Sequence, residues 1–351
     1  SIAGRLQHAA RILPAARAFF TPINFALRGL PAFIGLSCHG KVRHALIDIA
    51  VVIWDLASRP THVSELVQGP LDYAGYCDAS AFGAGGVWFG GLKTLEPIVW
   101  RLQWPKDVTN NVVSDSNPHG TITNSDLEMA GVLLQESVLE TAIGANMRGS
   151  QTAIGCDNSP AVAWTTRMAT HSTSPISFRL LKGLAMRQRY KRSTPPAVYH
   201  VAGVKNTLAG VASRPVAGVA AHFHLLSSSP TDMCPQTFLT RFDSMYPLPQ
   251  QRPWSNVQPP SGLWCNVISM LRGQRLALRQ WTTRLDLPPG PTGPTTPPKP
   301  KSIPTFGTSR EHSNKPISSH LPPGFELGST GTRSKSDVPY THLSLPTPYT
   351  R

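Results

Sequence analysis

The chain has 351 residues, and 40% of them are hydrophobic, which excludes a wholly disordered polar chain and allows at least one packed domain. It carries 33 Lys and Arg against 19 Asp and Glu, a formal net charge of +14, which favours a polyanionic partner such as nucleic acid, although a membrane surface or a basic tail would account for the same charge. The most apolar stretch, residues 45–56, contains Asp48 and Asp55, and the sequence does not start with a charged segment of the signal-peptide type, which predicts a core helix and neither a membrane span nor a signal peptide. We therefore expect an intracellular protein with no membrane segment.

Proline content divides the chain into two parts. Residues 1–230 contain 14 of the 34 prolines, whereas the shorter stretch of residues 231–351 contains the other 20. The second part therefore has little apolar sequence per proline with which to form a core. The five cysteines are isolated, with no CxxC pair, which predicts neither a zinc site nor a disulfide framework and favours a reducing compartment.

The first 70 residues are predicted to be helical. Short helices are interrupted at Pro14, Pro22 and Pro31, and a longer helix covers about residues 41–57, where apolar residues recur at three- and four-residue spacing. Pro60 follows the end of that helix.

From residue 72 the apolar period changes from that of a helix to that of strands. We predict an α/β fold with a mixed five-stranded sheet, its strands at residues 72–77, 86–89, 97–104, 152–156 and 197–201. The Ala- and Gly-rich turn between the first two strands predicts a hairpin. Helices are predicted from Ser125, where Ser125 to Glu128 form a capping-box pattern, after Asp157, from Ser174-Pro175, and at residues 207–213.

Three acidic residues are the candidate catalytic and metal-binding groups. Asp78 ends the first strand, Asp157 ends the fourth, and Glu128 lies in the first turn of the helix between them. Because ligand sites in such sheets form at the carboxyl ends of strands, we expect the three carboxylates to converge. Their hard oxygens predict two Mg²⁺ ions, with Mn²⁺ as a substitute, for phosphodiester hydrolysis. The structural alternative is a turn or cap role for each, with Glu128 closing the capping box.

Four segments resemble, in order, the active-site blocks of the ribonuclease H domain of long-terminal-repeat-type and DIRS-like retrotransposons: YCDASAFGAGGVWFG, NSDLEMAG, GCDNSPAVAW and YHVAGVKNTLAGVASR. The resemblance covers about residues 4–215 and implies a ribonuclease H-like fold that hydrolyses the RNA strand of an RNA–DNA hybrid. It assigns the acids of the first three blocks to Asp78, Glu128 and Asp157, with Asp126 as the rival in the second block.

The segments on either side of residue 40 extend the same resemblance. GRLQHAARILPAARAFFTPI resembles the end of a reverse-transcriptase thumb, and LASRPTHVSELV resembles the connection to ribonuclease H. The reverse-transcriptase part of the same polyprotein is therefore an expected partner. The paired aspartates of a polymerase palm are not found, so no polymerase activity is expected.

The fourth block departs from the family pattern, N-x-x-A-D-x-x-S-R. Gly210 stands where that pattern has the fourth metal-binding aspartate. A glycine supplies no ligand and weakens a short helix by roughly 1 kcal/mol relative to alanine. We therefore expect weaker binding of one of the two ions and impaired activity.

A run of six basic residues without an acid is expected to contact phosphates, with a solvated helix face as the alternative. The residues are Arg179, Lys182, Arg187, Arg189, Lys191 and Arg192. Residues 242–281 are predicted to contain one amphipathic basic helix, loosely similar to the segment that leads toward the tyrosine recombinase of DIRS-like elements.

The expected organisation is a helical thumb and connection remnant at residues 1–70, a ribonuclease H-like domain at 71–215, a linker with a possible basic helix at 216–287, and a disordered Pro/Ser/Thr-rich tail at 288–351. Three functional interpretations stay open: an active ribonuclease H, a catalytically inactive module that binds nucleic acid, and a decayed remnant or piece of a longer reading frame. DDE-type integrases share the fold class, but their glutamate comes last, whereas here it lies between the two aspartates.

Overall fold

The computed structural model describes residues 8, 14–20, 23, 40–147, 149–170, 174–214 and 236–281. The chain divides into two units, Ser1–Pro291 and Thr292–Arg351, and all described residues belong to the first. The tail expected at residues 288–351 lies outside the described residues, as do the helix breaks expected at Pro22 and Pro31.

A six-stranded mixed sheet forms the centre of the first unit, with the strand order β5-β4-β1-β2-β3-β6. The strands are β1 (Tyr73–Ala79), β2 (Gly83–Gly90), β3 (Ile98–Gln103), β4 (Thr152–Cys156), β5 (Ala197–His200) and β6 (Ser255–Asn256). β1, β2 and β3 pair antiparallel, whereas β1–β4, β4–β5 and β3–β6 pair parallel. The α/β class and the first five strands were predicted; β6 was not.

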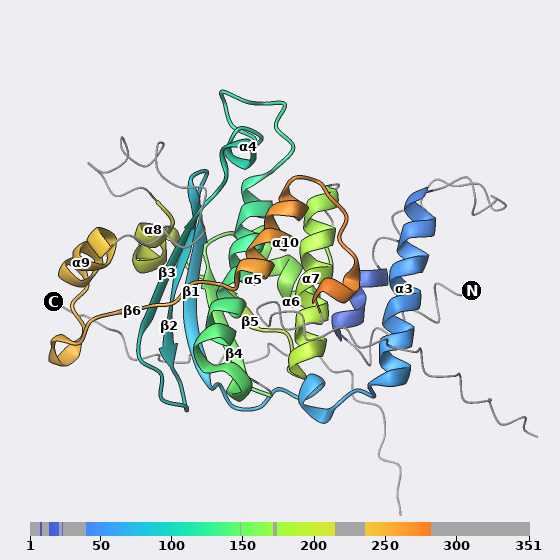
Figure 1. Ribbon diagram of the computed structural model, residues 1–351, viewed down its shortest axis with the longest axis horizontal. Coiled ribbons are helices and arrows are strands. Elements are labelled where there is room, and N and C mark those ends of the chain that lie inside the picture. Colours follow the sequence, from blue (N-terminus) through green and yellow to red (C-terminus); the bar gives the residue numbers. More distant parts are fainter. Residues whose placement is uncertain are drawn as a thin grey trace, which may run out of the picture. The chain divides into compact units, whose positions relative to one another are not determined.

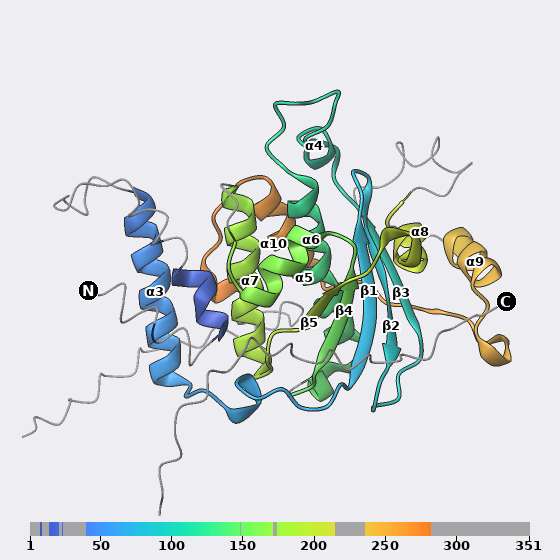
Figure 2. The same ribbon diagram turned by 180° about the vertical axis from the view of Figure 1, so that it is seen from behind.

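One face of the sheet is covered by a thick layer of helices (Figures 1 and 2). α5 (Asn124–Ile143) lies against the sheet, and α6 (Ser159–Arg167), α7 (Pro175–Lys191) and α10 (Ser261–Leu271) pack around it. α3 (Gly40–Ser58) lies farther out, beside α7. The predicted start of α7 is confirmed: Pro175 is its first residue, and the Ser174 hydroxyl accepts a hydrogen bond from the Ile176 amide (3.2 Å).

The other face is covered by two shorter helices, α8 (Thr207–Ser213) and α9 (Gln236–Met245). They bury a second hydrophobic cluster made of Val87, Val99, Ala212, Phe238, Phe242 and Trp254. Short turns connect the elements: η1 (Pro14–Ala16), η3 (Val63–Glu65), α4 (Lys106–Thr109), η4 (Gly144–Met147), η5 (Gly203–Lys205), η7 (Pro249–Gln251) and η8 (Leu278–Trp281).

Gly85 on β2 sets how closely α8 approaches the sheet. A Cβ atom at Gly85 would lie 2.5 Å from the carbonyl carbon of Ala212, so any larger residue would push the helix away. Gly85 pairs with Asp78 across β1 and β2. The glycine-rich hairpin therefore brings the end of α8 next to Asp78.

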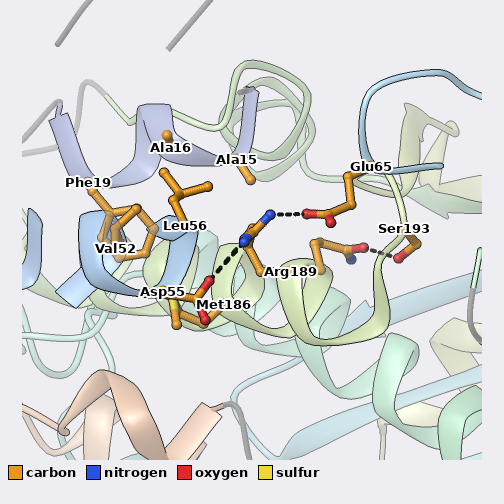
Figure 3. A pocket seen from close by; sticks show the side chains of 11 residues that line it. Ala15, Ala16, Phe19, Val52, Asp55, Leu56, Glu65, Met186, Arg189 and Ser193 are labelled. Atoms are coloured by element: carbon orange, nitrogen blue, oxygen red, sulfur yellow. Dashed lines mark hydrogen bonds and ion pairs between the residues drawn. The ribbon is translucent and has the colours of Figure 1, made fainter. Parts of the chain in front are cut away.

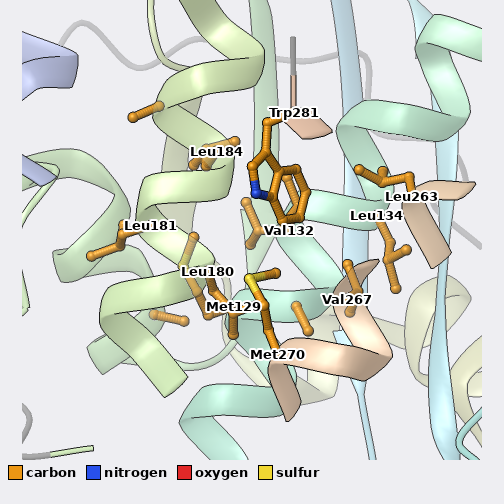
Figure 4. Close-up of a cluster of buried hydrophobic side chains, with 14 of the residues drawn as sticks. Met129, Val132, Leu134, Leu180, Leu181, Leu184, Leu263, Val267, Met270 and Trp281 are labelled. Carbon is orange, nitrogen blue, oxygen red and sulfur yellow. The ribbon is translucent and has the colours of Figure 1, made fainter. Parts of the chain in front are cut away.

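The single helix predicted within residues 242–281 is wrong, and so is the description of this region as a linker. The segment is divided among α9, β6, α10 and η8, and it contributes to both faces of the sheet. Trp281 is buried among side chains of α5, α7 and α10 (Figure 4). Gly183 on α7 leaves room for its indole, because a Cβ there would lie 3.0 Å from Cζ2 of Trp281. Buried aromatic surface thus outweighs the high proline content of this part of the chain.

Candidate functional site

The three predicted acids lie at one end of the sheet. Asp78 is near the carboxyl end of β1, and Asp157 directly follows the neighbouring parallel strand β4. Glu128 approaches from α5, in the layer above these strands. Asp78 and Glu128 are buried, and Asp157 is partly exposed.

Glu128 is not part of the helix cap, which corrects the capping box predicted at Ser125. The N-cap of α5 is Thr123, and its reciprocal partner is Asp126, whose carboxylate accepts a hydrogen bond from the Thr123 amide (2.9 Å). Asp126 also accepts a hydrogen bond from the Ser177 hydroxyl (2.5 Å). Asp126, the other candidate acid of this block, therefore serves in the helix cap and in the contact with α7. Glu128 has no part in the cap and faces the ends of the strands.

Several acidic side chains lie close together at this site, and the pKa values of two of them are raised. Burial is the main cause that raises the pKa of Glu128 well above its ordinary value, and the neighbouring Cys156, Asp78 and Asp157 add to the effect. Burial also raises the pKa of Asp157, again with a contribution from Asp78. A cation placed between these groups would favour their charged forms.

Glu128, Cys156 and Asp157 form a group that could hold a metal ion. One ligand atom from each lies within 4.8 Å of the other two. Glu128 and Asp157 offer the hard oxygens that Mg²⁺ prefers. Asn206 is a further oxygen donor that the sequence argument missed: it lines the cleft beside Asp157, its Oδ1 is buried with no hydrogen-bond partner, and its Nδ2 donates to the Cys77 carbonyl (3.0 Å).

A cleft of about 410 Å³ opens at this end of the sheet. Asp78 and Asp157 line it, together with Arg241 of α9 and Tyr246 of the segment after α9. Arg214 also lines the cleft, and its charge lowers the pKa of Asp157, partly offsetting the larger effect of burial. The contribution of α9 could not be anticipated from sequence, because α9 was expected to belong to a linker.

Gly210 lines the same cleft, as its place in the fourth block predicts. A Cβ atom at this position would meet nothing within 4 Å, so a larger side chain has room to extend into the cleft. Three residues later, the Ser213 hydroxyl donates a hydrogen bond to Asp78 Oδ2. The end of α8 therefore supplies Asp78 with a neutral hydroxyl partner and no carboxylate.

The expected phosphate contact of the basic run is contradicted for four of its six residues, which form ion pairs inside the protein. The pairs are Lys182–Asp48, Arg187–Glu140, Arg189–Asp55, Arg189–Glu65 and Lys191–Glu136. Figure 3 shows Arg189 between the two carboxylates. These cations stabilise the packing of α7 against α3, η3 and α5. For the partly buried Arg179 and Arg192, phosphate contact stays a prediction.

The chain was compared with protein-family models and with curated proteins, and none of them matches it. Among the helices of the described residues, none combines the length and apolar character that crossing a membrane requires. His200 hydrogen-bonds through Nε2 to the Asp157 carbonyl (3.1 Å) and thereby joins the ends of β4 and β5.

Proposed function

We propose that this domain is a ribonuclease H-like nuclease that uses divalent cations to hydrolyse the RNA strand of RNA–DNA hybrids. The observation that supports the proposal is the group of ligand atoms from Glu128, Cys156 and Asp157 at one end of a mixed sheet, beside an open cleft lined by Asp157 and by Asp78, which lies outside that group. The order of the first five strands and their helices suits this fold, and β6 is an addition at the edge.

The side chains have distinct tasks in such a reaction. Glu128 and Asp157 would hold the cation, with Asp78 and the unpartnered oxygen of Asn206 beside it. When bound, Mg²⁺ or Mn²⁺ supplies an activated water and stabilises the leaving oxygen of the phosphodiester. Ser213 holds the Asp78 carboxylate in place through its hydroxyl.

We assign phosphate contact to basic residues that line the cleft, and not to the ion-paired basic residues of α7. Arg214 and Arg241 lie on its walls with exposed side chains, where they can approach a nucleic-acid backbone. Each such contact releases counterions, so binding of the hybrid should weaken as salt is raised.

A binding module without catalysis is the second candidate function, and Gly210 favours it. The cleft has no carboxylate at this position, so the second ion would be held by fewer charged oxygens. A domain of this kind would still bind the hybrid through Arg214 and Arg241.

A cleavage assay on an RNA–DNA hybrid, in Mg²⁺, in Mn²⁺ and in chelator, tests both functions. Asp157→Asn should abolish cleavage in either metal and leave binding of the hybrid in place. Gly210→Asp should increase cleavage, most clearly in Mg²⁺, because it adds an anionic oxygen in open space. Gly210→Asn is the matched control, since it has nearly the same size and also removes the helical glycine but adds no charge.

The outcomes separate the two functions. Cleavage that needs metal and Asp157 supports the nuclease. Binding of hybrid without cleavage by the unmodified protein, Gly210→Asp and Gly210→Asn supports the binding module. Cleavage that survives both chelator and Asp157→Asn would contradict the assignment of the site.

A further inference from the structure

Two buried cysteines lie directly beneath the carboxylates. Cys77 and Cys156 each precede one of the two aspartates, on the neighbouring parallel strands β1 and β4. Because side chains alternate along a strand, the thiols face the α5 layer, on the side from which Glu128 approaches. Both residues are fully buried, and neither forms a disulfide.

The distances among these groups fit a shared metal ion. The Cys156 thiol donates to Glu128 Oε2 across 3.7 Å. With Zn–S and Zn–O bonds of about 2.3 and 2.0 Å, the sulfur and oxygen ligands of a tetrahedral ion are separated by about 3.5 Å. Asp157 completes a group whose ligand atoms all lie within 4.8 Å of one another.

We propose that Cys156, Glu128 and Asp157 form a binding site for a thiophilic divalent cation such as Zn²⁺, with solvent as the remaining ligand. Thiolate sulfur favours zinc and cadmium, whereas Mg²⁺ takes oxygen ligands almost exclusively. The Cys156 thiol releases its proton to solvent when it binds the ion. The inference depends only on the geometry of these three side chains, and does not require that the domain be a nuclease.

Occupation of this site has a consequence for Mg²⁺. Glu128 and Asp157 would serve both ions, so the two cannot use these carboxylates at once. Zn²⁺ should therefore compete with Mg²⁺ at the end of the sheet, and an excess of Mg²⁺ should displace it poorly because magnesium does not bind the Cys156 thiolate.

Cadmium is the direct probe, because cadmium–thiolate bonds absorb in the ultraviolet. The background protein carries Cys38→Ser, Cys234→Ser and Cys265→Ser, which leaves only the two buried thiols. We expect one Cd²⁺ per chain, with an absorption band that persists in a tenfold excess of Mg²⁺ and is lost on adding excess Zn²⁺. The band should be absent from the variant that also carries Cys156→Ser, because the only sulfur ligand is lost, and Cys77→Ser is the matched control that should keep it.

Glu128→Gln provides a variant that keeps both thiols and should weaken Cd²⁺ binding at least tenfold. Zn²⁺ should also raise the melting temperature of the background protein, and this rise should disappear with Cys156→Ser. Absence of the band in a folded background protein would overturn the proposal, as would a band of equal strength in the Cys156→Ser variant. A protein that cleaves hybrid but binds no Cd²⁺ would refute the thiophilic site alone, and one that binds Cd²⁺ without cleaving would refute the nuclease alone.

Discussion

Replacing Arg189 by methionine tests whether the basic residues of α7 stabilise the fold or bind phosphates. Its guanidinium donates to Asp55 Oδ2 through Nε (3.1 Å) and Nη2 (3.0 Å), and to Glu65 Oε2 through Nη1 (2.5 Å). Nη2 also donates to the Arg59 carbonyl (2.6 Å). Methionine fills much of the same space but leaves two carboxylates without this partner.

The expected cost follows from burial. The side chains of Arg189, Asp55 and Glu65 are only 8%, 13% and 7% exposed, and removal of one member of a buried pair costs about 3–5 kcal/mol. Arg272→Met is the matched control. Arg272 pairs with Asp107 at 2.6 Å, but the two side chains are 43% and 52% exposed, and such pairs contribute about 0–1 kcal/mol.

Urea denaturation measures both variants, and titration of a labelled hybrid at several salt concentrations measures binding. We expect the midpoint of Arg189→Met to fall far more than that of Arg272→Met, with an unchanged denaturant slope. Its hybrid affinity and salt dependence should stay the same under conditions where it is folded. A loss of stability below about 1 kcal/mol, together with a salt slope reduced by about one, would show that Arg189 binds phosphate and that its ion pairs do not hold α7.

Three other predictions concern the site and the second part of the chain. Arg241→Ala should reduce the salt slope of hybrid binding by about one and change the free energy of unfolding by less than about 0.5 kcal/mol. Unchanged hybrid binding would show that α9 does not contact the substrate. Trp281→Ala should lower the free energy of unfolding, measured by urea denaturation, by about 3–5 kcal/mol. An unchanged free energy would support the prediction that residues 216–287 are a linker. The raised pKa of Glu128 means that, in chelator, its contribution to stability is fully present below pH 4.5 and is lost as pH rises through the folded-state pKa. Glu128→Gln should therefore flatten the decline of unfolding free energy above pH 4.5, and a parallel pH profile would contradict the assigned burial.

Local patterns were sufficient to predict most of the elements that position the site. Alternating and continuous apolar runs located β1 to β5, and Ser174-Pro175 located the start of α7. The same patterns placed Asp78 and Asp157 at the ends of strands. Parallel pairing of β1 with β4 then brings these two acids together, because equivalent ends of adjacent parallel strands lie at one edge.

Features that depend on partners distant in sequence could not be predicted in this way. The basic residues of α7 have the same local pattern whether they meet solvent, phosphate or acids, and the acids that pair with Arg189 lie more than 100 residues earlier. Strand β6 has two residues, too few for a periodic signal, and it forms because Ser255 and Asn256 pair with β3. The cysteines are far apart in sequence, and only the pairing of β1 with β4 brings Cys77 next to Cys156.

The assignment of Glu128 depended on such a distant contact. Thr123 and Ser125 both suit an N-cap, and each would recruit the acid three residues later, Asp126 or Glu128. These acids are two positions apart, about 200° around a helix, so only one can cap while the other faces elsewhere. The Ser177 hydroxyl on α7 donates to Asp126, an interaction across 51 residues that favours the cap at Thr123. Because the cap uses Asp126, Glu128 is free to face the ends of β1 and β4.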